Sequence, residues 1–381
     1  MSTRSTIYLD HAAGTDILPE IKSQLAEWVH EFSGNPSGIH GVGRRAASLL
    51  DDARSGFAQV IGAKGNEILF TSGGTEANNL ALLGLASASQ NQGKHIISCA
   101  TEHPSTLEAL KHLEGEGFNI SYLPVNANGD IDLNELSSLI TAETILISIM
   151  WVNNETGLVH PIPEIAQIAH SQGVLLHSDA VQALGHIPIR VDEIPVDVLS
   201  FSGHKLGAPS GIGCLYLRKG TTLEHRSYGG SQENNLRAGT QNLLGVRALA
   251  LAAKHQTENL ENNTHHYNML VDHAIKRLSQ IPGTQINRSG AAYSPHILNC
   301  SIRGVDGEAL FIRLDLANIC VSNGSACSSG SQAPSHVLTA MGIDKALAQA
   351  SLRISFGLRT TREEVDVFCD ELAHIITSLE G

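Results

Sequence analysis

Residues 68–77 read Ile-Leu-Phe-Thr-Ser-Gly-Gly-Thr-Glu-Ala, an apolar run that stops at two glycines and passes into a helical pattern. From this stretch onward the chain alternates short apolar runs with longer helical segments as far as about residue 218. Several runs are rich in Ile, Val and Leu with little alternation, as expected of strands that are buried on both faces. The predicted strands are 68–70, 95–99, 120–123, 144–151, 174–177, 198–201 and 213–217.

Helical segments are predicted between these strands, at 75–88, 105–116 and 162–172, and two amphipathic helices precede them at 18–31 and 44–61. Strand–helix–strand alternation predicts an α/β fold with a mostly parallel seven-stranded sheet that is covered by helices. In open sheets of this type ligands bind at the C-terminal ends of the strands, so we expect the chemistry at that edge.

A length of 381 residues predicts about two domains. A long helical stretch at 243–280 follows a polar loop, and after it short apolar runs mix with helices in a different pattern. These apolar runs are 297–302, 319–321 and 352–355, and the helices lie near 308–316, 334–341 and 361–379. We predict a large domain over residues 15–258 and a smaller α+β domain formed by residues 1–14 and 259–381, which carries the loop with Cys327.

Composition argues against several classes of protein. The formal net charge of −13 argues against a nucleic-acid surface, because phosphate binding needs clustered Lys and Arg. The longest apolar run, 145–152, is too short to span a membrane, and the first ten residues lack the apolar core of a signal peptide. We therefore expect a cytoplasmic protein with no membrane or direct nucleic-acid contact.

The six cysteines form no CxxC pair and have no His at finger-like spacing, so we expect no metal site. In the cytosol their thiols are expected to stay reduced. Five of them are interpreted as small buried apolar residues, namely Cys99, Cys214, Cys300, Cys320 and Cys369.

The first candidate site is the glycine-rich turn that ends the opening stretch. Gly74 and Thr75 follow the strand 68–70, and Thr75 stands where a helix begins. Glycines let the backbone approach a ligand closely, and the unpaired N–H groups of a helix N-terminus bind phosphate. The alternative is an ordinary tight turn with Thr75 as a helix cap. No GK[ST] follows, so a nucleotide P-loop is not predicted.

Two charged residues follow later strands in the same way. Asp179 can pair with a cationic ring nitrogen and so keep pyridoxal phosphate electron-withdrawing. Lys205 lies on a short loop where a lysine can form a Schiff base. The loop also holds Ser202, Gly203 and His204, of which Ser202 and His204 can contact phosphate. Taken alone, the aspartate is better interpreted as a helix cap and the lysine as a solvated surface residue.

The three features predict one cofactor when they are combined. A phosphate-binding turn, a carboxylate for a ring nitrogen and a Schiff-base lysine occur in chain order, each at the end of its own strand. One pyridoxal phosphate site explains this order better than three coincidences. His103 can stack on the ring and move protons, or it only opens the helix that starts at Pro104. Asn154 can hydrogen-bond the ring oxygen or the substrate.

Cys327 separates this chain from a generic pyridoxal enzyme. It lies in the stretch Val-Ser-Asn-Gly-Ser-Ala-Cys-Ser-Ser-Gly-Ser at 321–331, whose short side chains predict an exposed, mobile loop. An exposed thiol on such a loop suits movement between an active site and a partner, and a persulfide is one of its accessible states. The alternative is a bystander cysteine.

Together these residues resemble the cysteine desulfurases of the NifS/IscS type, in the class V aminotransferase group of fold-type I pyridoxal enzymes. The resemblance runs over nearly the whole chain, and the motifs keep their order. Besides the segments around Thr75, His103, Asn154, Asp179, Gln182 and Lys205, it includes Ile7-Tyr8-Leu9-Asp10, Gly34-Asn35-Pro36-Ser37, Leu236-Arg237-Ala238-Gly239-Thr240, Gly324-Ser325-Ala326-Cys327 and Leu352-Arg353-Ile354-Ser355.

The resemblance implies a role for each matching residue. Lys205 would carry the cofactor and move protons, Asp179 would pair with the pyridine nitrogen, and His103 would stack on the ring as acid–base. Gln182 would contact the ring hydroxyl. Arg353 would clamp the substrate carboxylate through its bidentate fork. The other implied contacts are Gly74, Thr75, Ser202, Gly203 and His204 at the cofactor and its phosphate, Asn35 and Asn154 near the substrate, and Thr240 at the phosphate of the neighbouring subunit, which implies a homodimer.

The implied activity is removal of sulfur from L-cysteine, which leaves L-alanine and a persulfide on Cys327 for an acceptor protein. A selenocysteine or cystine lyase on the same fold is the alternative. A non-enzymatic sulfur carrier is disfavoured because Lys205 and Asp179 are intact. The long form of the Cys327 loop is similar to the IscS/NifS branch and not to the SufS branch.

The acceptor is left open by the resemblance. Iron–sulfur cluster assembly, tRNA thiolation and DNA phosphorothioation all draw on this family. The chain stops at Gly381, without the extension that housekeeping members use to dock an iron–sulfur scaffold. Ser231, Asn234 and Asn235 depart from the family pattern, in which Gly or Arg is usual, and they lie in the loop expected to cross to the other subunit.

Overall fold

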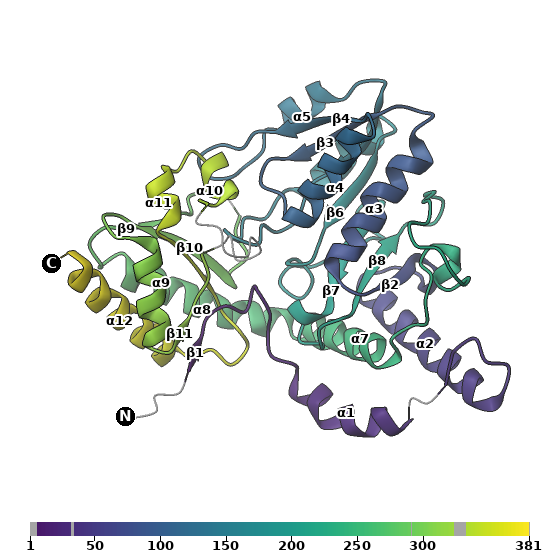
Figure 1. The fold of residues 1–381 in the computed structure, drawn as a ribbon, viewed down its shortest axis with the longest axis horizontal. Helices are drawn as coiled ribbons and strands as arrows, with labels where there is room; N and C mark the ends of the chain where they lie inside the picture. Colours follow the sequence, from purple (N-terminus) through teal and green to yellow (C-terminus); the bar gives the residue numbers. More distant parts are fainter. Residues whose placement is uncertain (1–5, 32–33, 291, 324–332, 381) are drawn as a thin grey trace.

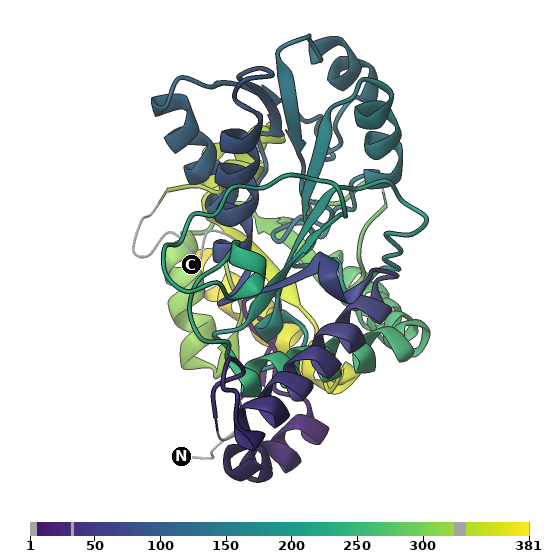
Figure 2. The ribbon, with the colours of Figure 1, turned by 90° about the vertical axis from the view of Figure 1, so that its right-hand side faces the viewer.

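The computed structural model describes residues 6–31, 34–290, 292–323 and 333–380, and the predicted sulfur acceptor Cys327 lies outside this range. The apolar side chains of the described residues gather into two large bodies. Figure 1 shows them side by side, with the seven-stranded sheet in one and strands β9 to β11 in the other. Figures 1 and 2 both place the first two helices at the lower end of the molecule.

The predicted apolar runs form one sheet in the order β2-β8-β7-β6-β5-β3-β4. β8 is antiparallel to both neighbours and the other adjacent pairs are parallel, so the mostly parallel seven-stranded sheet is confirmed. Successive side chains of a strand point to opposite faces of the sheet. Accordingly, Ile68 and Phe70 join one apolar cluster and Leu69 joins another. The strands are β2 (Ile68–Thr71), β3 (His95–Cys99), β4 (Asn119–Leu123), β5 (Thr144–Ser148), β6 (Leu175–Asp179), β7 (Val198–Ser202) and β8 (Gly213–Leu217).

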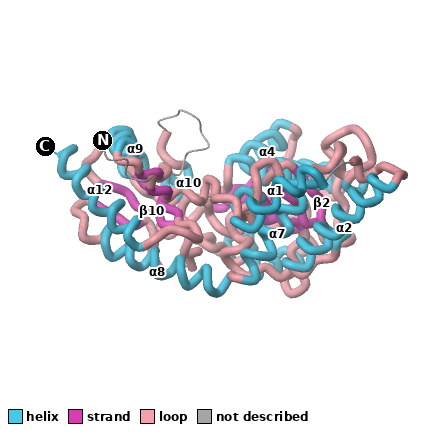
Figure 3. Tube along the Cα trace, turned by 90° about the horizontal axis from the view of Figure 1, so that it is seen from below, coloured by secondary structure: helices cyan, strands magenta, loops and turns pink. Residues whose placement is uncertain are grey.

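Helices cover both faces of this sheet, and Figure 3 shows the strands enclosed by them. The cluster on one face includes side chains of α2, α6 and α7, and the cluster on the other includes those of α3 and α4. The helices of this body are α1 (Pro19–Glu31), α2 (Gly41–Val60), α3 (Gly74–Ser89), α4 (Pro104–Gly115), α5 (Leu133–Leu139), α6 (Ile162–Ser171) and α7 (Leu243–Glu258).

The second body combines the N-terminal strand with the C-terminal part of the chain. Ile7 and Leu9 belong to its apolar core together with side chains from residues 267–376. The two separate cores support the predicted division into residues 15–258 and residues 1–14 with 259–381, which stays a prediction. The elements of the second body are β1 (Ile7–Tyr8), α8 (Leu260–Leu278), β9 (Thr284–Ile286), β10 (Ile297–Ile302), α9 (Gly307–Leu316), β11 (Ile319–Cys320), α10 (His336–Ala340), α11 (Lys345–Gln349), β12 (Ser351–Ser355) and α12 (Arg362–Glu380).

The single long helix predicted over 243–280 is wrong, because the chain leaves helical geometry at Asn259, between α7 and α8. The side-chain Nδ2 of Asn259 donates to the carbonyl oxygen of His255 at 2.8 Å. A side chain that bonds nearby backbone in this way offers an alternative to continued helix, which explains the break. The strand predicted to reach residue 151 ends at Ser148.

One buried ion pair ties the loop after β8 to the sheet. Arg54 donates from Nη1 and Nη2 to the two carboxylate oxygens of Glu233, both at 2.7 Å. The backbone N–H of Phe70 donates to the same carboxylate at 2.8 Å, and the Glu233 side chain is fully buried. Glu233, Asn234 and Asn235 have φ angles of 46°, 59° and 64°, so three successive residues are left-handed.

We predict that Glu233→Ala destabilises the protein by about 3 kcal/mol or more, because it leaves the Arg54 guanidinium without its partner in the interior. Urea denaturation followed by circular dichroism measures this change. The matched control is Asp192→Ala, which breaks the exposed Arg190–Asp192 pair and should leave the denaturation midpoint unchanged. Equal effects of the two substitutions would contradict the prediction.

Candidate active site

A cavity of about 310 Å³ lies where the strands β2, β3, β5, β6 and β7 reach their C-terminal ends. This is the edge of the sheet at which the sequence predicted the chemistry. The structure brings ten of the predicted site residues together in its wall: Gly74, Thr75, His103, Asn154, Asp179, Gln182, Ser202, His204, Lys205 and Arg353. The remaining lining residues, which the sequence did not single out, are Ala12, Ala13, Asn78, Ser105, Met150, Val152 and Val181.

The glycine-rich turn at the beginning of α3 packs closely against the loops that follow β6 and β7. A Cβ atom added to Gly74 would lie 2.8 Å from Cγ2 of Val181 and 3.5 Å from Cβ of Ser202. Gly73, which precedes the helix, provides no side chain to cap it. The N–H groups of the first turn therefore have no side-chain acceptor from Gly73, which suits a bound anion.

The loop after β7 places hydroxyl and imidazole groups next to this turn. Ser202 Oγ lies 2.9 Å from Nδ1 of His204. Burial, reinforced by the positive charge of Lys205, lowers the pKa of His204 to about 4. His204 is therefore neutral near pH 7, and its contribution to anion binding is a hydrogen bond and not a charge.

Asp179 and His103 are joined by a chain of polar side chains. Asn78 Nδ2 donates to Asp179 Oδ2 at 2.6 Å and to Ser105 Oγ at 2.9 Å, and Ser105 Oγ lies 2.7 Å from His103 Nδ1. The backbone N–H of Val181 donates to the other carboxylate oxygen of Asp179. Asp179 thus bonds the turn that follows it and lines the cavity, but no helix forms between β6 and β7, so the interpretation as a helix cap is wrong.

For His103 the structure confirms that the residue opens α4, whereas its role toward a cofactor ring stays a prediction. Its Nδ1 accepts from the backbone N–H of Ser105 at 3.1 Å, so it caps α4, and its ring also lines the cavity. Because Nδ1 is an acceptor, the neutral ring carries its hydrogen on Nε2. Burial lowers the pKa of His103, and Asp179 opposes this shift while Lys205 adds to it.

The N-terminal segment closes one side of the cavity. Lys205 Nζ donates to the carbonyl oxygens of Ala12, at 2.5 Å, and Ala13, at 2.7 Å. The carbonyl oxygen of Ala12 also accepts from Gln182 Nε2 at 2.9 Å. The two carbonyl groups therefore hold the lysine nitrogen within the cavity. The sequence did not predict this contact between Lys205 and the N-terminal segment.

Arg353 enters the cavity from β12 and is nearly fully buried. Its Nη2 donates to Asp10 Oδ1 at 2.8 Å and its Nη1 donates to the carbonyl oxygen of Asn154 at 3.0 Å. Its Nε is buried and has no hydrogen-bond partner among the described residues. The guanidinium thus keeps a donor that a bound carboxylate can use.

Four predicted residues do not line this cavity. Gly203 lies behind the lysine turn, where an added Cβ would come within 2.7 Å of Ile212 Cγ2. Asn35 and Thr240 are exposed, on the loop between α1 and α2 and on the loop before α7. Cys327 is outside the described residues. The roles assigned to these four stay predictions.

Two buried carboxylates near the site were not predicted. Glu102 is fully buried, and its Oε1 accepts from the backbone N–H of Met150 at 2.7 Å. Burial, and then the charge of Asp179, raise the pKa of Glu102 well above its ordinary value. Glu155 is also buried, and its Oε2 accepts from the hydroxyl of Ser335. Glu102 and Glu155 lie in the polar stretches that follow β3 and β5, and this position was the one sequence feature that could have indicated them.

Four of the five remaining cysteines are buried, as predicted, but Cys320, in the short strand β11, is partly exposed. In the part of the chain that the structure describes, no group of three or more His, Cys, Asp or Glu side chains is arranged to hold a metal ion. None of the described helices is long and apolar enough to cross a membrane.

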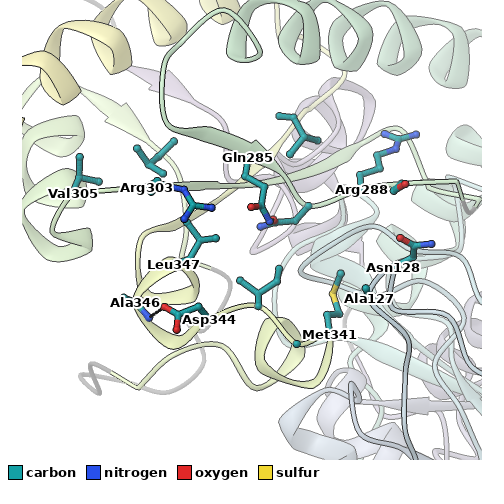
Figure 4. Close-up of a pocket in the computed structure, with 17 residues that line it drawn as sticks. Ala127, Asn128, Gln285, Arg288, Arg303, Val305, Met341, Asp344, Ala346 and Leu347 are labelled. Atoms are coloured by element: carbon teal, nitrogen blue, oxygen red, sulfur yellow. Dashed lines mark hydrogen bonds between the residues drawn. The ribbon is translucent and has the colours of Figure 1, made fainter.

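A larger groove of about 810 Å³ is lined mainly by the second body and also by the loop between β4 and α5. The residues labelled in Figure 4 come from that loop (Ala127 and Asn128), from the β9 region, from the segment after β10 and from the α10–α11 region. Its charged lining residues are Arg288, Arg303 and Asp344, of which Asp344 caps α11 through Oδ1. None of the predicted site residues lines this groove. Volume therefore does not identify the candidate site, whereas the convergence of polar groups does.

The model of the aminotransferase class-V family matches residues 7–368 of this chain. The chain belongs to the class-V aminotransferase family. Its sequence is 43% identical to that of the cysteine desulfurase IscS of Dictyoglomus turgidum, over 98% of this chain and 95% of that protein. Among solved structures, a NifS-like protein matches with a TM-score of 0.93 and 34% identity, over 98% of this chain and all of the other. A structure of SspA in complex with cysteine matches with a TM-score of 0.82 and 32% identity, over 92% of this chain and 99% of the other.

Members of the class-V aminotransferase family generally depend on pyridoxal phosphate, and the residues of this cavity fit that group. The first turn of α3, which no side chain of Gly73 caps, suits a phosphate. Asp179 supplies a buried carboxylate, Lys205 a primary amine, and Arg353 a donor without a partner. The volume lies at the lower end of the range typical of small-molecule sites.

We predict that Glu102→Gln stabilises the protein relative to wild type increasingly as the pH rises above about 4.5, the ordinary pKa of a glutamic acid. The folded chain keeps Glu102 protonated while the unfolded chain releases the proton, so wild-type stability falls with rising pH. The substitution removes this linkage. Melting temperatures at pH 5 and pH 8 measure it, with the exposed Glu27→Gln as control. A difference from wild type that does not change between the two pH values would contradict the prediction.

Proposed function

We propose that this chain is a cysteine desulfurase, a pyridoxal-phosphate enzyme that converts L-cysteine to L-alanine and transfers the sulfur to Cys327 as a persulfide. The observation that carries the proposal is the convergence of Lys205, Asp179 and His103 on one cavity, in a chain of the class-V aminotransferase family. The relatives named cysteine desulfurase, and the related structure that contains cysteine, support this choice of substrate.

In this proposal the cofactor is held by groups of different chemistry at its two ends. Gly74, Thr75, Ser202 and His204 would bind the phosphate, with Gly203 supporting the turn that carries Lys205. Asp179 would hold a proton on the ring nitrogen, and Gln182 would bond the ring oxygen. Pyridoxal phosphate supplies an electron-withdrawing ring, which weakens the bonds at the α and β carbons of an attached amino acid.

The amino acid would be oriented by its carboxylate. The donor of Arg353 that lacks a partner, Nε, supports this assignment, as does the contact of the same guanidinium with the backbone of Asn154. Asn35 and the Asn154 side chain would lie near the substrate. The neutral ring of His103 carries its hydrogen on Nε2, which can donate that proton and take it back. Lys205 Nζ can accept a proton from the substrate α carbon and return it.

The sulfur transfer would be a displacement at the substrate sulfur. The thiolate of Cys327 forms a new S–S bond while the bond between Cβ and Sγ of the substrate breaks. The electron pair of the broken bond passes to the carbon, which takes up a proton and leaves as the methyl group of alanine. Cys327 keeps the sulfur as a persulfide, from which an acceptor protein can take it.

We also propose that the enzyme works as a homodimer in which Thr240 of one subunit reaches the phosphate bound by the other. Thr240 is exposed and does not line the cavity of its own chain, although it follows the firmly anchored residue Glu233 by only a few positions. Ile39 and Tyr228 are exposed large apolar side chains, 92% and 84% accessible, on the two loops that also carry Asn35 and Thr240. Contact with a second subunit would remove their apolar surface from water.

We predict that Cys327→Ala still takes up pyridoxal phosphate and turns yellow but releases no alanine above background from cysteine in a single turnover. The reason is that the substitution removes the nucleophile and leaves every described residue of the cavity wall unchanged. Absorption spectra and amino-acid analysis of the quenched reaction measure the two properties. Cys320→Ala is the matched control, since this partly exposed thiol of the second body does not line the cavity, and its alanine yield should equal that of wild type. Undiminished alanine from the Cys327→Ala protein would refute the proposed role.

A selenocysteine or cystine lyase on the same fold is the second candidate, because the Cys327 thiol would then be dispensable. Turnover of wild type and Cys327→Ala on cysteine, selenocysteine and cystine separates the two. Loss of turnover with cysteine alone in Cys327→Ala supports the desulfurase. Turnover that favours selenocysteine or cystine and survives the substitution supports the lyase.

The acceptor, whether it serves iron–sulfur cluster assembly, tRNA thiolation or DNA phosphorothioation, can be sought by pull-down with the persulfide-loaded protein.

A further inference from the structure

Two histidines that have no role in the site described above, His186 and His296, are stacked on each other next to its wall. Their ring centroids are 3.4 Å apart and their planes are 4° from parallel. Burial lowers the pKa of His186 to about 3. It lowers the pKa of His296 well below its ordinary value, with further lowering by His186, Arg353 and His11. Both rings are therefore neutral at physiological pH.

The hydrogen-bond partners of His296 select one tautomer of its neutral ring. Its Nε2 lies 3.3 Å from Oε1 of Gln182, and its Nδ1 lies 2.7 Å from Oγ of Ser294. The side-chain oxygen of a glutamine can only accept, so Nε2 must carry the hydrogen and donate it. Nδ1 is then the acceptor for the hydroxyl of Ser294.

Gln182 is held from its other end as well. Its Nε2 donates to the carbonyl oxygen of Ala12 at 2.9 Å. Rotating the amide by half a turn would oppose its N–H to that of His296 and its oxygen to that of Ala12, and both contacts would repel. The amide therefore has one orientation, and its second N–H is left for a group bound in the cavity that Gln182 lines.

We infer that His296 is a positioning residue of this enzyme: it fixes the side-chain amide of Gln182 so that the amide offers an N–H, and not its oxygen, to the ring oxygen of the cofactor. The inference rests on the proposed function, since it requires pyridoxal phosphate in the cavity. His186 supports the plane of the His296 ring by stacking but makes none of these hydrogen bonds to Gln182.

The expected consequence concerns the charge on the bound ring. An N–H donor stabilises negative charge on the ring oxygen and so favours the deprotonated cofactor. Without His296 only the carbonyl oxygen of Ala12 orients the amide of Gln182, so the amide turns its oxygen toward the ring more often. The pH midpoint of the visible absorption change should then move upward, and pyridoxal phosphate should bind about five- to tenfold more weakly, as expected for one lost buried hydrogen bond.

The test uses His296→Leu, prepared without cofactor and reconstituted with pyridoxal phosphate. Its dissociation constant and its absorption between pH 6 and pH 10 are compared with those of wild type. His296→Gln places an amide N–H near the former Nε2 and should restore most of both properties. His186→Phe, which keeps a flat stacked ring, should leave the midpoint at the wild-type value. In a Gln182→Leu background, His296→Leu should add no further shift, because the residue acts through the glutamine.

The outcomes separate the inference from the function on which it rests. A wild-type chain that takes up no pyridoxal phosphate overturns both. Normal uptake with the same midpoint in wild type and His296→Leu overturns the positioning role alone, as does an equal shift in His186→Phe. If His296→Leu does not fold, Ser294→Ala serves instead: it removes the hydroxyl that donates to Nδ1 and so weakens the hold on the His296 ring, and it should shift the midpoint upward by a smaller amount. No shift in that variant overturns the inference.

Discussion

The carbonyl oxygen of Ala12 is the point at which the two bodies of this chain and its candidate site meet. It accepts from Lys205 and Gln182, which stand on loops after two different strands of the large sheet. The N–H of the same residue donates to Ser355 in β12 of the second body. The segment that contains Ala12 runs on from Leu9, a residue of the second apolar core. The geometry of the cavity therefore depends on how the two cores are joined, and not on the sheet alone.

Electrostatics in the cavity follow from burial more than from the number of charged residues. His204 is neutral near pH 7, and burial likewise lowers the pKa of His103. The charge of Arg353 is balanced by Asp10. A phosphate would thus be bound mainly by N–H groups and hydroxyls at the first turn of α3, which is consistent with anion binding by a chain whose net charge is −13.

Much of the fold and of the candidate site was predictable because both depend on local pattern. Unbroken apolar runs are typical of strands covered on both faces, and polar residues directly after them must gather at one edge of a parallel sheet, as Asp179 and Lys205 do. Asn78, Ser105 and Ala12 were not predicted because their importance arises from contacts between distant segments. Asn78 lies about one helical turn beyond Thr75 and so on the same face of the helix. This spacing is the one local feature of the sequence that could have indicated its place in the site. The break at Asn259 was missed because it depends on one side chain bonding nearby backbone.

The left-handed backbone at Glu233, Asn234 and Asn235 limits which sequences can serve in the loop that leads to Thr240. Outside glycine, asparagine is among the residues that tolerate this conformation best, whereas β-branched residues are strained in it. Asn234 and Asn235 are therefore compatible with the path of this loop. Variation among relatives should accordingly be restricted at these positions by backbone shape, with Asn and Gly interchangeable and Val or Ile excluded. Glu233 adds a second restriction, because its carboxylate must stay opposite Arg54 for the loop to begin in the same place.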